Sequence, residues 1–233
     1  MSEILEVSNL SFAYGQAQVL FDINIRTGGL VTGIVGRNGA GKTTLLRTIA
    51  GLEKPTGGRI LLGKTDITGL PAWKITKLGI SYVPQDKRVF TSLTAYEHLL
   101  IAANAKLGKS GDVEAEIEKA MDYFPRLRVV KDSRASNLSG GERQMLNIAM
   151  ALFGSTKLLM LDEPTEGLAP ALTRTFGEVL KEKSREVPMI LVEQNVPLLK
   201  DVCDRIYVLE EGRIIHEEKS RDEVQEGGFA KYL

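Results

Sequence analysis

A glycine-rich loop between an apolar strand and a helix constrains the fold of this chain more than any other feature of its sequence. The loop reads Gly36-Arg-Asn-Gly-Ala-Gly-Lys42-Thr43, and it lies between the β-branched run Val31–Val35 and the helical pattern Thr44–Ala50. Glycines allow backbone N–H groups to turn inward around a phosphate at a helix N-terminus. Lys42 is suited to the β- and γ-phosphates, and Thr43 offers a hydroxyl ligand for Mg²⁺. The sequence therefore predicts a strand–loop–helix unit that binds a nucleotide.

The rest of the chain predicts an α/β core of parallel strands linked by helices. Helical periodicity from about Asp86 to Phe153 predicts a helical insertion in this core, and Glu210-Glu-Gly212 predicts a hairpin turn. The residues expected around the phosphates are Gly36, Arg37, Asn38, Gly39, Ala40, Gly41, Lys42, Thr43 and Thr44. Further strands are predicted at Ile4–Val7, Ile23–Ile25, Arg59–Leu62, Gly79–Val83, Lys157–Leu161, Met189–Val192, Arg205–Leu209 and Arg213–Ile215, and helices at Ala95–Ala105, Val113–Phe124 and Leu172–Arg185.

Two adjacent carboxylates, Asp162 and Glu163, follow the apolar strand at Leu158–Leu161. Ligands of a parallel sheet gather at the carboxyl ends of its strands, so this pair is expected beside the phosphate loop. Asp162 would then hold the magnesium shell, and Glu163 would face the γ-phosphate and polarise a water molecule. The alternative is a pair of solvated acids that ends a strand.

Gln85 and Tyr14 are two further candidates for the nucleotide site. Gln85 follows a predicted strand and Pro84, where its amide could coordinate Mg²⁺ and report the γ-phosphate to the helical insertion. A surface glutamine is the alternative. Tyr14 precedes Gly15 in an early turn, and its ring could stack on adenine. A buried structural tyrosine is the alternative there.

A Ser-Gly-Gly turn within Leu138–Glu142 predicts a second anion-binding surface. Two glycines after a serine expose several backbone N–H groups and a hydroxyl where a helix begins. One nucleotide needs only one such surface.

Composition narrows the function classes. Among 233 residues, 30 basic and 30 acidic side chains cancel, which gives no indication of nucleic-acid binding. The single cysteine, Cys203, is expected to be a buried apolar residue, and Trp73 is expected to be partly buried. His98 and His216 lack metal-ligand partners at useful spacing. No apolar run approaches eighteen residues, so any membrane role is expected to be peripheral.

These motifs resemble those of one family. Tyr14, the phosphate loop, Gln85, Leu138–Glu142, Asp162-Glu163 and Gln194 fall in the order and spacing of ABC-transporter ATP-binding subunits, and the similarity covers essentially the whole chain. The resemblance implies a P-loop NTPase fold with a RecA-like core, an antiparallel β subdomain and an inserted helical subdomain at roughly 86–153. All three would form a single ABC ATPase domain over residues 1–233.

The resemblance also implies an activity and its partners. The chain would bind ATP and Mg²⁺, with Thr43, Gln85 and Asp162 at the metal, and would hydrolyse ATP to energise transport. It would form a head-to-tail homodimer, or a heterodimer with a related subunit, in which Ser139, Gly140 and Gly141 close over ATP held by the partner. Integral-membrane permease subunits would dock near residues 86–100, and an extracytoplasmic binding protein would contribute indirectly. The location would be the cytoplasmic face of the plasma membrane.

Within this family the chain resembles two groups of importer ATPases. Leu168-Ala169-Pro170, Val192–Asn195 and Phe124–Leu127 look like branched-chain amino acid importers. Val83–Gln85 and Pro164–Gly167 look closer to urea and short-amide importers. Branched-chain, hydrophobic amino acids are the preferred substrate class, and the urea or amide class is the alternative.

Two positions depart from the family pattern. Gln194 stands where most members have a histidine, and an amide cannot exchange a proton near neutral pH. The role of general base then falls to Glu163, and Gln194 can only position other groups or sense the γ-phosphate. Ala169 replaces the usual aspartate of the following loop. Two alternatives from other classes stay open: a non-transport ABC ATPase that acts on DNA or ribosomes, and a regulatory nucleotide-binding module without turnover.

Overall fold

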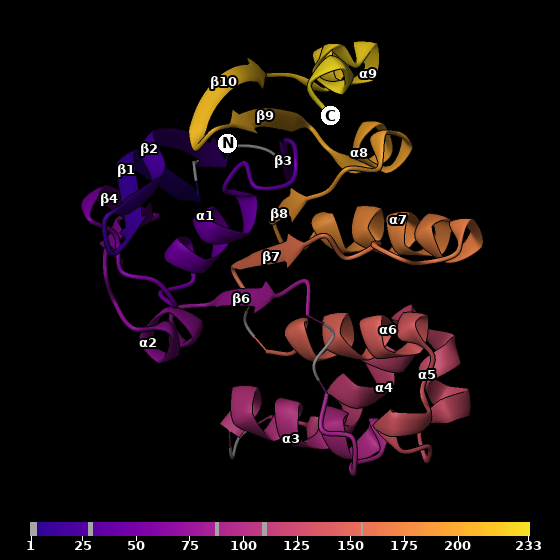
Figure 1. The fold of residues 1–233 in the computed structure, drawn as a ribbon. Helices are drawn as coiled ribbons and strands as arrows, with labels where there is room; N and C mark the ends of the chain where they lie inside the picture. Colours follow the sequence, from indigo (N-terminus) through magenta and orange to yellow (C-terminus); the bar gives the residue numbers. More distant parts are fainter. Residues whose placement is uncertain (1–3, 28–29, 87–88, 109–110, 155) are drawn as a thin grey trace.

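A six-stranded sheet, a four-stranded sheet and a separate group of helices make up the fold (Figure 1). The computed structural model describes residues 4–27, 30–86, 89–108, 111–154 and 156–233. The strands are β1 (Leu5–Tyr14), β2 (Ala17–Thr27), β3 (Val31–Val35), β4 (Gly57–Leu62), β5 (Thr65–Asp66), β6 (Ile80–Val83), β7 (Leu158–Asp162), β8 (Met189–Val192), β9 (Arg205–Glu210) and β10 (Arg213–Glu218). The helices are α1 (Lys42–Ile49), α2 (Ala72–Lys77), α3 (Ala95–Leu107), α4 (Val113–Tyr123), α5 (Pro125–Val130), α6 (Gly140–Ala151), α7 (Pro170–Ser184), α8 (Val196–Val202) and α9 (Arg221–Glu226), with short 3₁₀ turns η2 (Ala135–Asn137) and η3 (Gly228–Tyr232).

The six-stranded sheet has the order β10-β9-β3-β8-β7-β6. Its strands from β9 to β6 run parallel, and β10 pairs antiparallel with β9. All residues of β3, β7 and β8 are buried, which agrees with their unbroken apolar runs. Parallel pairing brings the carboxyl ends of β3, β6, β7 and β8 to one edge, and the phosphate loop follows β3 there. The predicted parallel α/β core is confirmed.

The four-stranded sheet is antiparallel, with the order β2-β1-β4-β5. Its first two strands are much longer than the fragments predicted at Ile4–Val7 and Ile23–Ile25, and they meet in a hairpin just after Tyr14. Asn9 has a φ of 49° and interrupts the pairing of β1, so the apolar alternation shifts in mid-strand. Helix α2 was not predicted, and the expected partial burial of Trp73 is wrong. Its side chain on α2 is 58% exposed, with the Lys74 and Lys77 ammonium groups 5.4 and 5.2 Å from its ring centre.

Helices α3 to α6 form the helical lobe, which lies apart from the sheets in Figure 1. Helix α6 packs against the other three, and its buried apolar residues include Leu146 and Ile148. A capping box begins α3, in which Thr94 and Glu97 bind each other's backbone N–H groups. Phe124 of the lobe contacts Phe176 of α7, with ring centres 5.6 Å apart, so the lobe and the sheet layer share one apolar core.

Several single residues complete the fold. Cys203 is buried as expected, and burial raises the pKa of its thiol. The buried His98 ring accepts the Phe90 N–H at Nε2 and contacts the Thr94 carbonyl through Nδ1, which holds the segment before α3.

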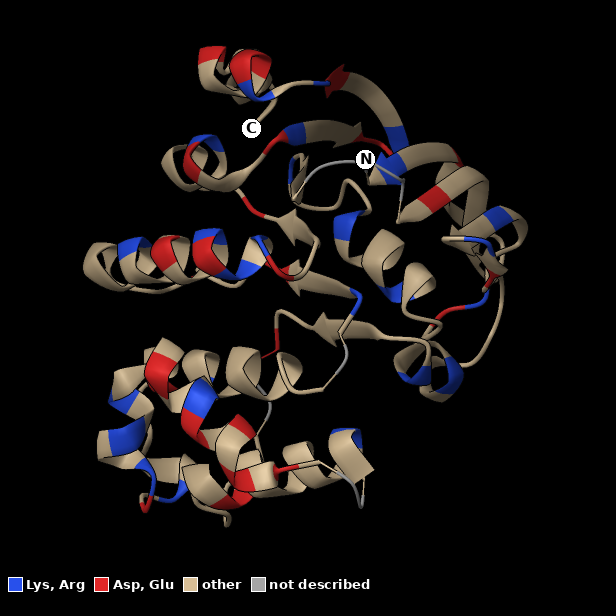
Figure 2. Ribbon diagram, turned by 180° about the vertical axis from the view of Figure 1, so that it is seen from behind, with Lys and Arg blue, Asp and Glu red and all other residues tan. Residues whose placement is uncertain are grey.

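Within the described residues, no helix combines the length and apolar character needed to cross a bilayer. Basic and acidic residues are interspersed over the helical lobe and over the rest of the fold, which we call the core lobe (Figure 2).

Candidate functional site

The phosphate loop folds tightly between β3 and α1. Gly36 has a φ of 150°, and a Cβ there would lie 2.0 Å from the Leu209 carbonyl oxygen, so this position needs glycine. Lys42 opens α1 and is only 5% exposed. Its ammonium donates to the Gly36 carbonyl at 2.8 Å and to the Arg37 carbonyl at 3.2 Å. The lysine therefore lies folded over the loop, where its charge faces the cavity that the loop surrounds.

This cavity has a volume of about 590 Å³. Its lining combines the phosphate loop and the segments that follow β6, β7 and β8 with one residue of β2: Val19, Asn38, Gly39, Gly41, Lys42, Thr43, Thr44, Gln85, Glu163, Thr165, Glu166, Glu193, Gln194 and Asn195. Five separate parts of the sequence thus meet here, and four of them lie at the carboxyl edge of the parallel sheet, as the strand order requires.

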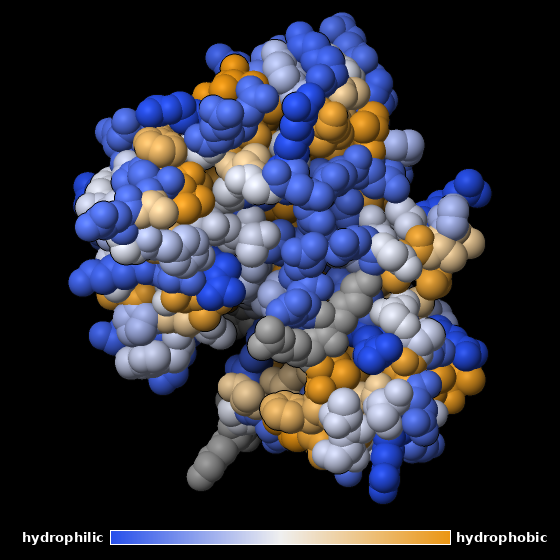
Figure 3. Space-filling model, viewed as in Figure 1, coloured by the Kyte–Doolittle hydropathy of each residue, from blue (hydrophilic) through white to orange (hydrophobic). Residues whose placement is uncertain are grey.

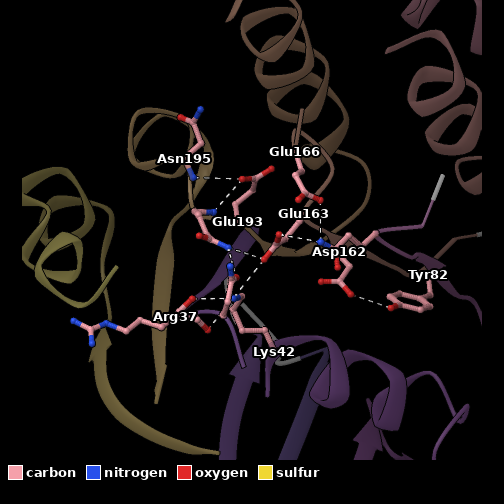
Figure 4. Close-up of polar contacts among 12 residues, drawn as sticks. Arg37, Lys42, Tyr82, Asp162, Glu163, Glu166, Glu193 and Asn195 are labelled. Atoms are coloured by element: carbon pink, nitrogen blue, oxygen red, sulfur yellow. Dashed lines mark hydrogen bonds and ion pairs between the residues drawn. The ribbon is translucent and has the colours of Figure 1, made fainter. Parts of the chain in front are cut away.

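Glu163 lies at the centre of the polar contacts in this cavity (Figure 4). Its Oε1 is 3.4 Å from the Lys42 ammonium and accepts the Gln194 amide at 2.9 Å. Its Oε2 accepts the Gln85 amide at 3.3 Å. Glu163 has a φ of 47°, in the left-handed region that non-glycine residues rarely adopt. The turn after β7 therefore holds this carboxylate in a fixed position between Lys42 and two amides.

Asp162, the last residue of β7, is fully buried. Its Oδ2 accepts the Tyr82 hydroxyl at 3.1 Å. Burial raises the pKa of the Asp162 carboxyl, and the nearby Thr43 hydroxyl and the Tyr82 hydrogen bond offset this only in part. The same environment raises the pKa of the Tyr82 phenol.

The residues around Asp162 fit a magnesium ion. Within the described residues, no hydrogen bond reaches the buried Oδ1 of Asp162, and the Thr43 hydroxyl lies close enough to the carboxylate to lower its pKa. A hydroxyl and a carboxylate oxygen are ligands that Mg²⁺ accepts. Gln85 is placed differently, because its amide nitrogen donates to Glu163 and, at 2.9 Å, to Glu166.

Two acidic residues of the cavity were not predicted from the sequence. Glu166 accepts the Gln85 amide, and Glu193 is buried below Gln194, where it accepts hydrogen bonds from Thr165. Nothing in the local sequence distinguishes them from solvated acids, since their partners lie 81 and 28 residues away. The apolar strand that precedes Glu193 was the single feature of the sequence that could have indicated a place in the cavity for this residue.

Ser139, Gly140 and Gly141 lie outside the cavity, at the start of α6. Ser139 caps this helix, with its hydroxyl accepting the Glu142 N–H at 3.3 Å, and the Glu142 carboxylate accepts the Ser139 N–H at 2.8 Å. Ser139 and Gly140 are exposed, whereas a Cβ on Gly141 would meet Leu172 of α7 at 2.7 Å. One chain therefore presents this turn on a surface of its own.

Tyr14 and Ala169 also lie outside the cavity lining. Tyr14 is 49% exposed at the β1–β2 hairpin, so the alternative of a buried tyrosine is wrong. Its ring packs edge-on against Phe12, and its hydroxyl donates to Glu53 at 3.4 Å. Ala169 precedes Pro170 at the start of α7 and offers no side-chain cap. Lys87 and Arg88, next to the expected docking region, lie outside the described residues.

A glycine loop closed by a buried lysine, with carboxylates delivered by neighbouring parallel strands, defines a P-loop nucleotide-binding protein. The ABC transporter family model matches residues 21–166, more than half of the chain. The chain belongs to the ABC transporter family. The predicted family, the P-loop fold and the class of enzyme, an ABC ATPase, are thereby confirmed.

Relatives and solved structures agree with this assignment over nearly the whole chain. The chain is 40% identical to the high-affinity branched-chain amino acid transport ATP-binding protein BraG of Pseudomonas aeruginosa, covering 91% of each. It is 38% identical to the probable branched-chain amino acid transport ATP-binding protein LivF of Archaeoglobus fulgidus, covering 98% of this chain and 97% of that one. It also resembles the ADP conformation of MJ1267, an ATP-binding cassette of an ABC transporter, with a TM-score of 0.82, 28% identity, and coverage of 97% and 94%.

Proposed function

We propose that this chain is the ATP-hydrolysing motor subunit of an importer for branched-chain, hydrophobic amino acids. The proposal of ATP hydrolysis rests on one observation: Glu163 contacts both Lys42 and Gln194 in the phosphate-loop cavity. The transport role and the amino-acid class rest on BraG and LivF, whose names describe branched-chain amino acid transport. An importer of urea or short amides is the alternative, supported by Val83–Gln85 and Pro164–Gly167.

The side chains of the cavity suggest a division of roles. Lys42 would exchange its carbonyl contacts and Glu163 for phosphate oxygens, and Thr43 and Asp162 would hold Mg²⁺. Bound Mg²⁺ would supply charge neutralisation at the phosphates. Glu163, released from Lys42, would accept the proton of the attacking water, since neither Gln194 nor Gln85 can take one up. The two amides would hold the carboxylate at its two oxygens.

The Ser139–Gly141 turn suggests how two copies work together. Its exposed residues, Ser139 and Gly140, lie outside the cavity of their own chain. We infer that it closes over ATP bound to a second cassette, in a homodimer or with a related subunit. Tyr14, exposed at its hairpin, would stack on adenine.

A groove between the two lobes suggests where a permease subunit docks. Leu52 is exposed on the core side, and Phe90 and Ile101 are exposed on the helical side. A cavity of about 370 Å³ lies between the core, at Leu52, and the helical lobe, and one of about 340 Å³ lies on the helical side at Phe90 and Ile101; the two share Met150. Figure 3 shows apolar side chains gathered on the helical lobe beside the hollow between the lobes. Docking here would place this single-domain cassette, residues 1–233 with the helical subdomain near 86–153, on the cytoplasmic face of a membrane.

Replacing Glu163 by Gln tests the proposed activity. Purified wild-type protein should release phosphate from ATP, and Glu163→Gln should lower kcat at least about a hundredfold while ATP still binds. The matched control is Glu178→Gln, which changes an exposed glutamate on α7 and should leave kcat unchanged. Wild-type protein that binds ATP without turnover would favour the regulatory module instead. Full activity of Glu163→Gln would contradict the base assignment.

A further inference from the structure

Glu193 directly follows β8 and is only 4% exposed, and its carboxylate is bound from two loops. Its Oε1 accepts the Thr165 N–H at 2.9 Å and the Thr165 hydroxyl at 2.6 Å. Its Oε2 accepts the N–H groups of Gln194 at 3.0 Å and Asn195 at 3.4 Å. One buried side chain therefore joins the loop after β7 to the loop after β8.

These four contacts require a carboxylate. Every group that faces Glu193 in these contacts is a donor, and an ionised carboxylate accepts at both oxygens while it donates nothing. A glutamine would turn an NH₂ group toward two of the donors and leave buried N–H groups without acceptors, which is costly. The site therefore selects the charge of Glu193 and is satisfied by it.

The two joined loops carry the central groups of the cavity. Thr165 lies two residues after Glu163, and Gln194 reaches from the other loop to Glu163 Oε1 and to Asn38 Oδ1, both at 2.9 Å. If the two loops moved apart, the Gln194 amide would leave the Glu163 carboxylate. The β7–β8 pairing, extended by the Glu163 N–H to the Val192 carbonyl at 2.9 Å, holds the start of the two loops, and Glu193 ties them together further along, at Thr165 and Gln194.

We propose that Glu193 is a positioning residue for ATP hydrolysis, which holds the Gln194 amide in register with Glu163 by tying both loops to one buried carboxylate. This inference rests on the proposed roles of Glu163 and Gln194. Glu193 lines the cavity, but both of its carboxylate oxygens are taken by donors of the protein, so it acts on the rate through the geometry of other groups. Misplacement of such groups by about 1 Å can lower a rate about a hundredfold.

Glu193→Gln tests this role against a buried glutamate elsewhere in the fold. Glu218 is 3% exposed, and its Oε1 accepts the Phe229 N–H at 2.6 Å near the C-terminal helices, so Glu218→Gln is the matched control. Both variants should lose thermal stability, but only Glu193→Gln should lower kcat, by about tenfold or more, with the dissociation constant for ATP within about threefold of wild type. Equal kcat in the two variants at matched folded fraction would overturn the proposal.

A second measurement on nucleotide-free protein separates positioning from general destabilisation. In Glu193→Gln, the amides of Thr165 and Gln194 should exchange their hydrogens faster than in wild type, while those of β7 and β8 stay protected. Thr165→Val removes one donor and should lower kcat less than Glu193→Gln, and the double variant should be no worse than Glu193→Gln alone. Unchanged exchange at both amides, or fully additive effects, would contradict the tie between the loops. Wild-type protein that binds ATP without turnover would instead refute the proposed function, and full turnover in Glu163→Gln would contradict the role of Glu163 on which this inference rests.

Discussion

The Glu163 carboxylate shows how single residues shape this site. Its Oε1 contacts Lys42 and Gln194, and its Oε2 contacts Gln85. If Lys42 binds phosphate and Glu163 is the base, as proposed, ATP binding would break the contact between them and free Glu163 when Lys42 gains phosphate partners. Substrate binding and release of the base would then be coupled through one ion pair.

Lys106 illustrates a charge that the fold partly buries without an acidic partner in an ion pair, within the described residues. Its ammonium donates to Ser81 Oγ at 2.8 Å and to the Ala151 carbonyl at 2.7 Å, and no acidic side chain in the described part of the chain forms an ion pair with it. Burial lowers the pKa of Lys106 to about 8. The lysine ties the end of α3 to β6 and to the C-terminal carbonyl of α6.

This lowered pKa predicts a dependence of stability on pH. Between about pH 8 and its unfolded pKa, the unfolded state binds more protons at Lys106 than the folded state, so the free energy of unfolding should rise with pH. The free energy of unfolding of wild type minus that of Lys106→Met should increase by about 1–3 kcal/mol from pH 8 to pH 10. Denaturant titrations of both proteins at each pH measure it. A difference that stays constant or shrinks with pH would show that Lys106 keeps an ordinary pKa.

At the scale of elements, a capping box begins each of the helices α3 and α6 of the helical lobe. The two helices differ in their proposed function. Thr94 caps α3 through the Glu97 N–H at 3.1 Å, and Ser139 caps α6 through the Glu142 N–H at 3.3 Å. The same local chemistry thus supports both helices. Only the cap of α6 belongs to the Ser-Gly-Gly turn that is proposed to meet a partner's nucleotide.

This pair allows the structural and functional parts of Ser139 to be separated. Thr94→Ala and Ser139→Ala should each lower the free energy of unfolding by about 1 kcal/mol, because each removes one cap hydrogen bond. Only Ser139→Ala should lower kcat, with ATP binding to the single subunit kept. Phosphate release, ATP binding and denaturant unfolding of both variants give the comparison. Similar turnover in the two variants would reduce Ser139 to a helix cap.

The elements that the sequence predicted well are those with local causes. The phosphate loop, the apolar strands of the parallel sheet and the helices of the lobe follow from short-range pattern, and their bounds differ from the structure by a few residues. The strands β1 and β2 were predicted only in part, because the bulge at Asn9 breaks their alternation. Helices α2, α5, α8 and α9 were not predicted individually, since each has only six or seven residues.

The parts of the site that were missed depend on distant partners. Glu193 and Glu166 look like surface acids in sequence, and only the folded loops bring Thr165 and Gln85 to them. The Lys42–Glu163 contact is similar, because it needs the order of β3, β8 and β7 in the sheet. Exposure of Trp73 was mispredicted for the same reason: α2 lies outside the sheets, where two lysines cover the ring in place of a core.

For the whole molecule, the groove between the lobes predicts a membrane partner. Phe90→Asp places a charge at a 69% exposed position of the groove, whereas Val129→Asp does so at a 72% exposed position of the same lobe outside the groove lining. Both variants should fold and keep basal turnover, since both side chains are exposed. Only Phe90→Asp should reduce the fraction of the protein that sediments with membranes of producing cells. Equal sedimentation of the two variants would exclude this groove as the docking surface.

The separation of the Ser139 turn from the cavity makes the strongest whole-molecule prediction. If each nucleotide site combines the cavity of one subunit with the turn of the other, Glu163→Gln and Ser139→Ala damage opposite halves of the site. Each variant alone should be nearly inactive. In a mixed dimer, however, the cavity of the Ser139→Ala subunit faces the intact turn of the Glu163→Gln subunit, so one complete site is restored.

When equal amounts of Glu163→Gln and Ser139→Ala pair at random, about half of the dimers are mixed. Each mixed dimer has one intact site out of two, so the turnover of the mixture should recover to about a quarter of the wild-type value. Lys42→Ala mixed with Glu163→Gln is the control, because both changes lie in the cavity half and no mixed dimer contains a complete site. Phosphate release from the two mixtures, measured against each variant alone, gives the answer. If the first mixture stays as inactive as the control, each chain completes its own site, and the Ser-Gly-Gly turn needs another explanation.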